Sequence, residues 1–221
     1  MKIDHSTTSV NRTNKNLTTF PQDIIESNQI LMPNLSSLFL SSNKIQNIPE
    51  ELGNVNNLWW LKLDNNVITE LPTSIGNLKQ LEIINLSNNR ISKLPLSIKN
   101  WQKIEKIDFS YNLLTKIPDY FGFFPNLRVL NIRNNKLTNL PKTIENAILL
   151  DELDITNNNF PESYRLPPKL CKNWKDGDIK IITEHSFDHF CNVKLLKSKK
   201  EKSIYDSTMG GFAGLIFGTQ K

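Results

Sequence analysis

Histidine and cysteine are scarce in this chain. Its 221 residues include three histidines and two cysteines, Cys171 and Cys191, and neither residue type occurs between positions 35 and 160. A Ser/His or Cys/His catalytic pair therefore cannot be assembled within that stretch. The chain also lacks a glycine-rich phosphate loop with a Walker-type lysine. We expect a non-enzymatic protein without a cofactor.

Long apolar runs are missing as well. No stretch of about 18 apolar residues is present, so we expect no membrane-spanning helix. The first eight residues lack the apolar run of a Sec signal peptide. The formal net charge is +5, and residues 161–221 carry +4 of it, so residues 35–160 are nearly neutral. This neutrality argues against nucleic acid as the partner of the central stretch.

One pattern recurs every 23 residues between Leu35 and Phe160. It reads Leu-x-x-Leu-x-Leu-x-x-Asn-x-Ile, followed by Leu/Ile-Pro and further apolar residues. The asparagine column is Asn43, Asn66, Asn89, Asn112, Asn135 and Asn158. A period of about 20–29 residues with this pattern is typical of a leucine-rich-repeat solenoid. We predict an α/β solenoid with a curved parallel sheet on the concave face and short helices or 3₁₀ turns on the convex face.

The repeats divide the chain into four parts. We predict an N-terminal cap with a degenerate first repeat (1–34), six repeats (35–160), a C-terminal cap (161–193) and a tail (194–221). The degenerate repeat has Val10 in an apolar column but Arg12 in the next one. From Pro21 to Pro49 is 28 residues, five more than the period. We expect the extra residues, within 24–31, to form a longer convex helix.

Function is expected at the strand positions whose side chains point away from the core, since side chains alternate across a strand. These positions form columns on the concave face that start with Ser37, Phe39, Ser41 and Ser42 and repeat every 23 residues. A cluster of large apolar side chains is predicted over the first three repeats. Such clusters usually mark interaction sites. The predicted anchors are Phe39, Trp59, Trp60 and Ile83.

Charged and polar positions on the same face are predicted to set specificity. Their signs alternate, which favours a specific protein partner over a polyanion. The predicted residues are Lys62, Asp64, Lys106, Asp108, Tyr111 and Arg133. The alternative is that the N-terminal cap shields Phe39 and Trp60, or that they are scattered surface residues.

The C-terminal cap contains one possible metal constellation. His185 and His189 are four residues apart, and Cys171, Cys191 and Glu184 are close in sequence. Histidines at this spacing near a cysteine could ligate zinc. No paired cysteine motif supports such a site, so we predict ordinary cap residues and no metal.

The tail combines a lysine-rich run, from Lys194 to Lys202, with an apolar, glycine-rich segment from Met209 to Gly218. Three interpretations are open. The segment docks on the cap, contacts a membrane beside the basic run, or acts as a sorting or secretion signal. Membrane contact through residues 194–221 would make the protein a membrane-recruited adaptor.

The repeats resemble the 23-residue class of intracellular leucine-rich repeats, which includes Ras-suppressor and Ras-group scaffold proteins. This resemblance covers residues 12–160. It implies an arc that binds proteins on its concave side, and it does not name a partner. We expect a monomer, with a small GTPase or a host signalling protein as candidate partners.

The chain is also similar in size, Asn/Lys/Ile-rich composition and tail to leucine-rich-repeat effectors that intracellular bacteria inject into host cells. That similarity implies export by a non-Sec route. Extracellular members of the family usually carry cysteine clusters in their caps, which two cysteines do not match. We therefore expect a cytoplasmic protein with reduced thiols.

Overall fold

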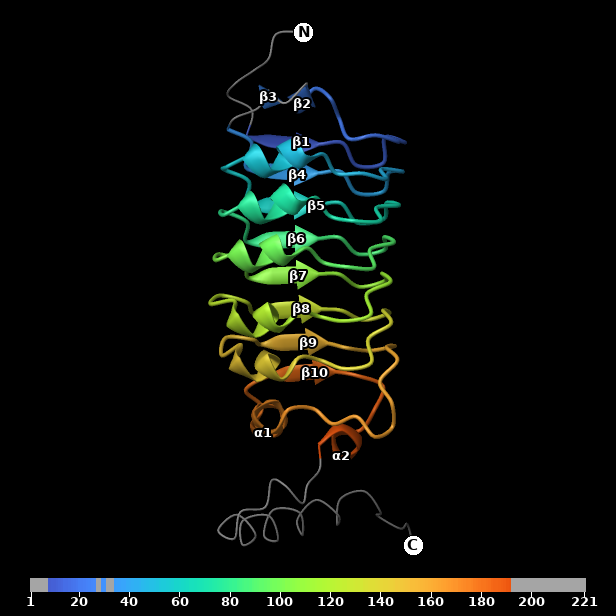
Figure 1. Ribbon diagram of the computed structural model, residues 1–221, viewed down its shortest axis with the longest axis vertical. Coiled ribbons are helices and arrows are strands. Elements are labelled where there is room, and N and C mark those ends of the chain that lie inside the picture. Colours follow the sequence, from blue (N-terminus) through green and yellow to red (C-terminus); the bar gives the residue numbers. More distant parts are fainter. Residues whose placement is uncertain (1–7, 27–28, 31–33, 192–221) are drawn as a thin grey trace, which may run out of the picture.

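The computed structural model describes residues 8–26, 29–30 and 34–191. Within these residues, eight short strands form one parallel sheet in the order β1-β4-β5-β6-β7-β8-β9-β10. The strands are stacked one above another along the long axis of the molecule (Figure 1). This is the predicted leucine-rich-repeat solenoid.

Each strand is three residues long, and its central residue faces the core. The strands are β1 (Ser9–Asn11), β4 (Ser37–Phe39), β5 (Trp60–Lys62), β6 (Ile83–Asn85), β7 (Lys106–Asp108), β8 (Val129–Asn131), β9 (Glu152–Asp154) and β10 (Lys180–Ile182). From β4 to β9 the paired residues are 23 apart, as in Leu61 with Ile84. The offset between paired strands therefore equals the repeat period.

Both end strands join the sheet with a longer offset. Ser9 pairs with Ser37, and Glu152 pairs with Lys180, which is 28 residues in each case. Val10 is buried, as predicted for the degenerate repeat. The C-terminal cap thus adds a strand to the sheet, which its sequence pattern did not indicate.

A second pairing lies beyond β1. β2 (Ile25–Glu26) and β3 (Gln29–Ile30) form a small antiparallel pair, so the predicted convex helix within 24–31 is wrong. Arg12, whose column is otherwise buried, forms an ion pair with Asp23 and stays part-exposed. The charge is tolerated here because the Arg12 side chain reaches solvent and pairs with a carboxylate.

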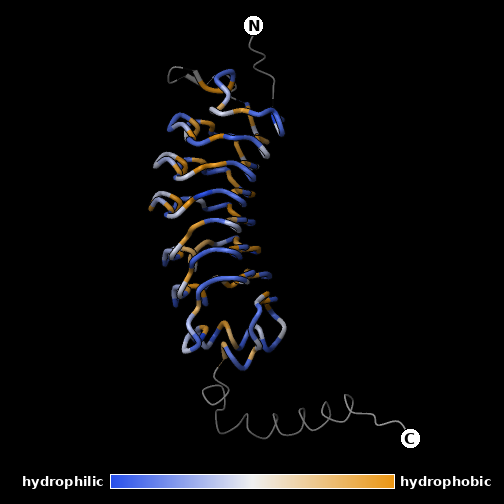
Figure 2. Tube along the Cα trace, turned by 90° about the vertical axis from the view of Figure 1, so that its right-hand side faces the viewer, coloured by the Kyte–Doolittle hydropathy of each residue, from blue (hydrophilic) through white to orange (hydrophobic). Residues whose placement is uncertain are grey.

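Among the described residues, the convex side carries five 3₁₀ helices, each starting after a proline of the repeat. They are η1 (Glu50–Asn54), η2 (Thr73–Asn77), η3 (Leu96–Asn100), η4 (Asp119–Phe123) and η5 (Lys142–Asn146). A proline fits here because its missing N–H falls among the donors that a helix start leaves unpaired. The solenoid bends in a shallow arc, and hydrophobic and hydrophilic segments alternate along each turn (Figure 2).

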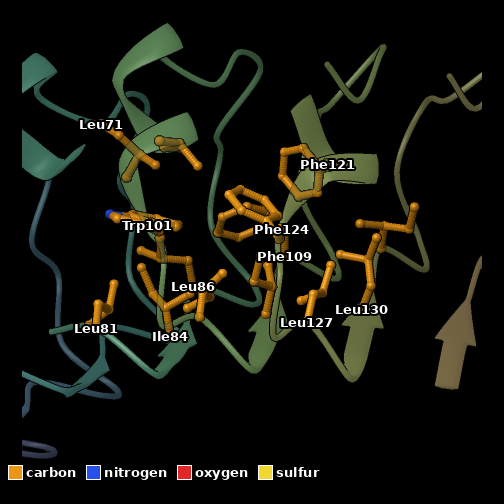
Figure 3. Close-up of a cluster of buried hydrophobic side chains, with 14 of the residues drawn as sticks. Leu71, Leu81, Ile84, Leu86, Trp101, Phe109, Phe121, Phe124, Leu127 and Leu130 are labelled. Atoms are coloured by element: carbon orange, nitrogen blue, oxygen red, sulfur yellow. The ribbon is translucent and has the colours of Figure 1, made fainter. Parts of the chain in front are cut away.

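Neighbouring 3₁₀ helices pack closely, except η3 against η4. A Cβ on Gly76 would lie 2.1 Å from the Ser97 carbonyl oxygen of the next helix, so glycine permits the close approach. At the equivalent position η3 has Lys99. Tyr120 of η4 bridges this wider gap, donating its hydroxyl to the Pro95 carbonyl at 3.0 Å. On the other side of η3, Trp101 is fully buried and donates its indole N–H to the Ile75 carbonyl of η2 at 2.9 Å (Figure 3).

The asparagine column holds successive turns together. Asn89 donates its Nδ2 to the carbonyls of Leu63 and Leu86, both at 3.0 Å, and accepts the Ile68 N–H at 2.9 Å. The same pattern recurs at the other buried asparagines of this column. One amide satisfies backbone groups that would otherwise be buried without partners.

The C-terminal cap closes the core with two helices, α1 (Pro168–Asp176) and α2 (Phe187–Phe190). Leu166, Leu170, Ile179 and Phe190 are buried beneath them. α1 ends at Gly177, whose φ of 82° is a left-handed conformation that glycine adopts without strain. None of the helices in the described residues is long and apolar enough to cross a membrane.

Candidate functional site

The outer side of the parallel sheet, here called the concave face, brings the predicted aromatic residues together. The rings of Phe39 and Trp60 meet edge to face with centroids 4.8 Å apart, and those of Trp59 and Trp60 lie 5.5 Å apart. All three are half-buried. The register places Ile83 directly beside Trp60. These four residues form what we call the aromatic cluster.

A surface depression of about 400 Å³ lies beside this cluster. We call it the first depression; its lining is Asn11, Thr13, Phe39, Ser41, Ser42, Trp60, Lys62 and Asp64. Asp64 is held in place because its Oδ1 accepts from Ser41 Oγ at 2.6 Å and its Oδ2 from Asn65 Nδ2 at 2.7 Å. Phe39 and Trp60 therefore line an open hollow rather than lying wholly beneath the described part of the N-terminal cap.

The last residue of most strands has a structural task. Its side-chain oxygen accepts the N–H of the residue two positions on, at 2.9–3.2 Å, which forms an Asx turn as the chain leaves the sheet. The residues that do this are Asn11, Asn85, Asp108, Asn131 and Asp154. Asp108, predicted to set specificity, thus also shapes its own turn, a role that the sequence analysis missed.

Within the six regular repeats, two strands lack this turn residue. Phe39 and Lys62 occupy the position, pair with each other in the sheet, and both line the first depression. Neither side chain can accept the turn's N–H. The regular turn chemistry is therefore absent at the two adjacent positions where the aromatic cluster lies.

Another column has left-handed backbone in every repeat. Its residues have φ between 51° and 57°, and they are Asn14, Ser42, Asn65, Asn88, Tyr111, Asn134 and Asn157. Asparagine tolerates this conformation better than other residues with a side chain. The two positions that depart from asparagine, Ser42 and Tyr111, line two different depressions of the concave face.

Tyr111 and Arg133 form a pair. The guanidinium donates a hydrogen bond to the Tyr111 hydroxyl, and its carbon lies 4.9 Å from the centre of the ring. This hydrogen bond, with smaller contributions from Asp154 and Asp108, raises the pKa of Arg133 above its ordinary value. Tyr111 is nevertheless 45% exposed. The ring is thus fixed in position yet open to solvent.

This pair borders a second depression of about 430 Å³. Its lining is Asn65, Ser87, Asn88, Asp108, Ser110, Tyr111, Asn131 and Arg133. The two depressions are adjacent, because Asp64 lines the first and Asn65 the second. Lys106 is exposed and pairs with Ile83 on one side and Val129 on the other in the sheet. It lines neither the first nor the second depression.

Some outward positions are less accessible than their column predicts. Ser37, Ser41, Ser110 and Asp154 are buried. Asn11 and Thr13 were not predicted as site residues, although they line the first depression. β1 pairs with β4 at an offset of 28 residues, which places Asn11 beside Phe39 and aligns Thr13 with Ser41.

The C-terminal cap contradicts the expectation of reduced thiols. Cys171 and Cys191 form a disulfide, with Cα atoms 5.7 Å apart, and both are buried. Neither sulfur is a thiolate, so neither can contribute to the zinc set considered above. His185 and His189 stack with ring centroids 4.3 Å apart. In the described part of the chain no group of three metal-ligating side chains gathers.

The basic run and the apolar segment of the tail lie outside the described residues, so membrane contact there stays a prediction. The cytoplasmic location and export to a host also stay predictions. The disulfide is the observation that bears on them, since disulfides persist mainly in oxidising compartments.

Comparisons with known proteins agree with the solenoid. The family profile for the leucine rich repeat matches residues 33–91 and 79–137. The solved structure of the leucine-rich-repeat protein LIC12759 from Leptospira interrogans is 30% identical over 75% of this chain, with a TM-score of 0.66. No curated protein sequence matches the chain.

A second solved structure shares the fold. It is the leucine-rich-repeat ectodomain of the Arabidopsis thaliana membrane receptor kinase GASSHO1/SCHENGEN3, in complex with CASPARIAN STRIP INTEGRITY FACTOR 2, and it is 24% identical over 69% of this chain, with a TM-score of 0.62. The present chain spans 40% of the Leptospira structure and 18% of the plant one.

Proposed function

We propose that this leucine-rich-repeat protein is a non-enzymatic interaction module that binds a protein partner through its concave face. The aromatic cluster provides the anchors, and Lys62 and Asp64 beside it set specificity. Lys106, Asp108, Tyr111 and Arg133 contribute further along the same face. The partner surface is a protein rather than a polyanion, since charges of both signs alternate here.

The observation that carries this proposal is the position of the aromatic cluster. Phe39 and Trp60 are only partly buried and lie beside an open depression. Their neighbours in the strands, Leu38 and Leu61, are fully buried in the core. Clustered apolar side chains that reach the surface often mark interaction sites, and tryptophan is enriched among the residues that contribute most to binding. The absence of the turn residue at Phe39 and Lys62 points to the same place.

The plant structure offers an analogy for binding by a solenoid of this fold, without indicating which face is used. That receptor ectodomain, which has the same fold, is in complex with CASPARIAN STRIP INTEGRITY FACTOR 2. A solenoid of this kind can therefore hold a ligand. A role as an effector on a small GTPase or another host signalling protein is a narrower form of the proposal, and it rests on the sequence resemblance alone.

The proposal is tested by affinity capture with the full chain as bait, from cytosol of the source organism and of any host. The double variant Phe39→Ala/Trp60→Ala should lose the proteins that the wild type retains. A matched control, Phe123→Ala/Ile148→Ala, removes two exposed apolar side chains that do not lie on the sheet. It should retain the same proteins as the wild type.

Two results would contradict the proposal. If the Phe39→Ala/Trp60→Ala variant captured the same proteins as the wild type, the aromatic cluster would not be the binding site. If its melting temperature fell as far as that of a core variant, the two rings would be structural and their exposure incidental.

A further inference from the structure

Tyr111 is the residue on the concave face that the fold explains least. Its left-handed backbone, with a φ of 53°, suits asparagine, which is found at five of the seven equivalent positions. A bulky side chain is strained in this conformation. The Arg133 contacts hold the ring but do not remove that strain. Such strain is expected mainly where a side chain has a binding role.

Tyr111 also interrupts a ladder of side-chain amides. Asn88 Nδ2 donates to Asn65 Oδ1 at 2.7 Å, and Asn157 Nδ2 donates to Asn134 Oδ1 at 3.2 Å, each one repeat back. The corresponding step from Asn134 leads to Tyr111, which offers no amide oxygen. Asn134 Nδ2 is buried and has no acceptor among the described residues. An asparagine at position 111 would supply one.

The second depression differs in chemistry from the first. Apart from Tyr111, its lining side chains are amides, hydroxyls, one carboxylate and one guanidinium. The Arg133 charge is opposed by Asp108 and Asp154, which both interact with it. The depression therefore suits an uncharged polar group better than a carboxylate. Peptide main chain is such a group, since each residue offers one N–H and one carbonyl.

We propose that the second depression binds the main chain of an extended peptide segment whose aromatic or aliphatic side chain is anchored at the aromatic cluster. This inference rests on the proposed function and names the kind of partner surface that it needs. Tyr111 and Arg133 are its specificity-determining residues. In other peptide-binding surfaces, hydrogen bonds to the main chain give affinity and pockets for side chains give specificity.

The spacing of the repeats fixes the length of the segment. Tyr111 follows β7, which is two strands from β5 with Trp60, and adjacent strands are about 4.8 Å apart. An extended peptide rises about 3.3 Å per residue. Two strand spacings therefore correspond to about three residues. Tyr111 also lies beyond the end of β7, whereas Trp60 begins β5, so the anchoring side chain and the main chain held by Tyr111 and Arg133 are about three to five residues apart.

The test uses a random 12-residue peptide library displayed on phage and selected on the intact protein. Selected peptides are then synthesised with single N-methylated amides, which remove one main-chain donor at a time. Binding is measured for the wild type and for Phe39→Ala/Trp60→Ala, Tyr111→Asn and Arg133→Ala. Arg128→Ala, an exposed arginine paired with Asp151, is the matched control.

We expect peptides with a shared aromatic or aliphatic residue. N-methylation about three to five residues from it should weaken binding to the wild type at least tenfold, while side-chain changes there should have little effect. Tyr111→Asn and Arg133→Ala should each weaken binding at least tenfold, and Arg128→Ala should not. Tyr111→Asn should also raise the melting temperature by about 2–3 °C, because it relieves the backbone and completes the amide ladder.

The failures are distinguishable. Peptides that are lost with Phe39→Ala/Trp60→Ala but unaffected by Tyr111→Asn and by N-methylation would overturn the main-chain site and leave the proposed function intact. Peptides that bind Phe39→Ala/Trp60→Ala normally would overturn both. The absence of any enriched peptide would overturn the peptide inference alone, since affinity capture tests the proposed function separately. A lower melting temperature for Tyr111→Asn would remove the argument from strain.

Discussion

Trp101 and Trp60 show how differently the interior of the solenoid and its concave face use the same residue. Trp101 is fully buried, and its indole N–H is bonded to a backbone carbonyl. Trp60 is half-buried among other aromatic rings beside an open depression. In the interior each column keeps its chemistry because successive turns must stack. On the concave face the departures from the column gather at two depressions, where binding is proposed.

The largest effect is expected from the two tryptophans themselves. Trp101→Ala should lower the free energy of unfolding by about 4 kcal/mol, because it leaves a cavity and removes the indole hydrogen bond to the Ile75 carbonyl. Trp60→Ala should lower it by about 1 kcal/mol or less, since its ring is already partly in water. Urea unfolding of both variants measures the difference. Equal losses would show that Trp60 belongs to the core.

The next effect concerns the contribution of the disulfide to the stability of the C-terminal cap. Cys171 and Cys191 are 20 residues apart, and a crosslink over a loop of that size contributes about 3 kcal/mol. Adding a reductant should therefore lower the melting temperature of the wild type. The Cys171→Ala/Cys191→Ala variant serves as the control, and its lower melting temperature should not respond to the reductant. If the melting temperature of the wild type did not change with the reductant, the presence of the disulfide would be contradicted.

A smaller contrast separates two adjacent asparagines. Asn89→Ala should cost about 2–3 kcal/mol, because it leaves buried backbone groups without partners. Asn88→Gly removes the side chain next to it, keeps the left-handed backbone possible and should cost about 0.5 kcal/mol. Chemical unfolding of the two variants compares them. Similar costs would mean that the exposed amide ladder is as important to stability as the interior one.

The smallest effect concerns pH on the convex side. Glu50 accepts the N–H groups of Ser74 at 2.8 Å and Thr73 at 3.0 Å, and hydrogen bonds with Ser74 lower its pKa below the ordinary value. A lowered pKa stabilises the fold above the unfolded-state value, about 4.3, and this contribution is lost as the pH falls through the lowered pKa.

Glu50→Gln should therefore lower stability at neutral pH by no more than about 0.5 kcal/mol, since the carboxylate is largely exposed. The difference from the wild type should vanish in acid, below the lowered pKa of Glu50. Unfolding measured in both conditions tests this. A constant difference across the range would assign the effect to something other than the carboxylate charge.

The sequence predicted the parts of the fold that depend on the period. Leu61, Asn89 and Pro72 each recur at a fixed offset, and their strand, amide column and 3₁₀ start were confirmed. The prediction failed where the period stops. The residues around Ile25 pair as strands instead of forming a helix, and Lys180–Ile182 join the sheet without a repeat motif. Pairing at a sheet edge depends on neighbours that local pattern does not show.

The candidate site divides in the same way. Alternation along the strands sufficed to place Phe39, Trp60 and Ile83 on one face, since side-chain direction is local. The pairing of Tyr111 with Arg133 and the bond between Cys171 and Cys191 were not foreseen. Spacing of 22 and 20 residues says nothing about distance until the turns are stacked or the cap is closed.

By itself the sequence determined that this chain is a solenoid, because a 23-residue period with leucine and asparagine columns can bury its apolar side only by stacking on its own copies. The tertiary structure alone decided which irregular residues matter. The period had already aligned Phe39 with Lys62 and Tyr111 with the asparagines of its column. The structure added that this column has a left-handed backbone, that the two irregular sites line separate depressions, and that Asn134 Nδ2 has no acceptor among the described residues. The physical reason is the register of the sheet. The effect of a residue that departs from its column depends on its contacts with the repeats stacked on either side.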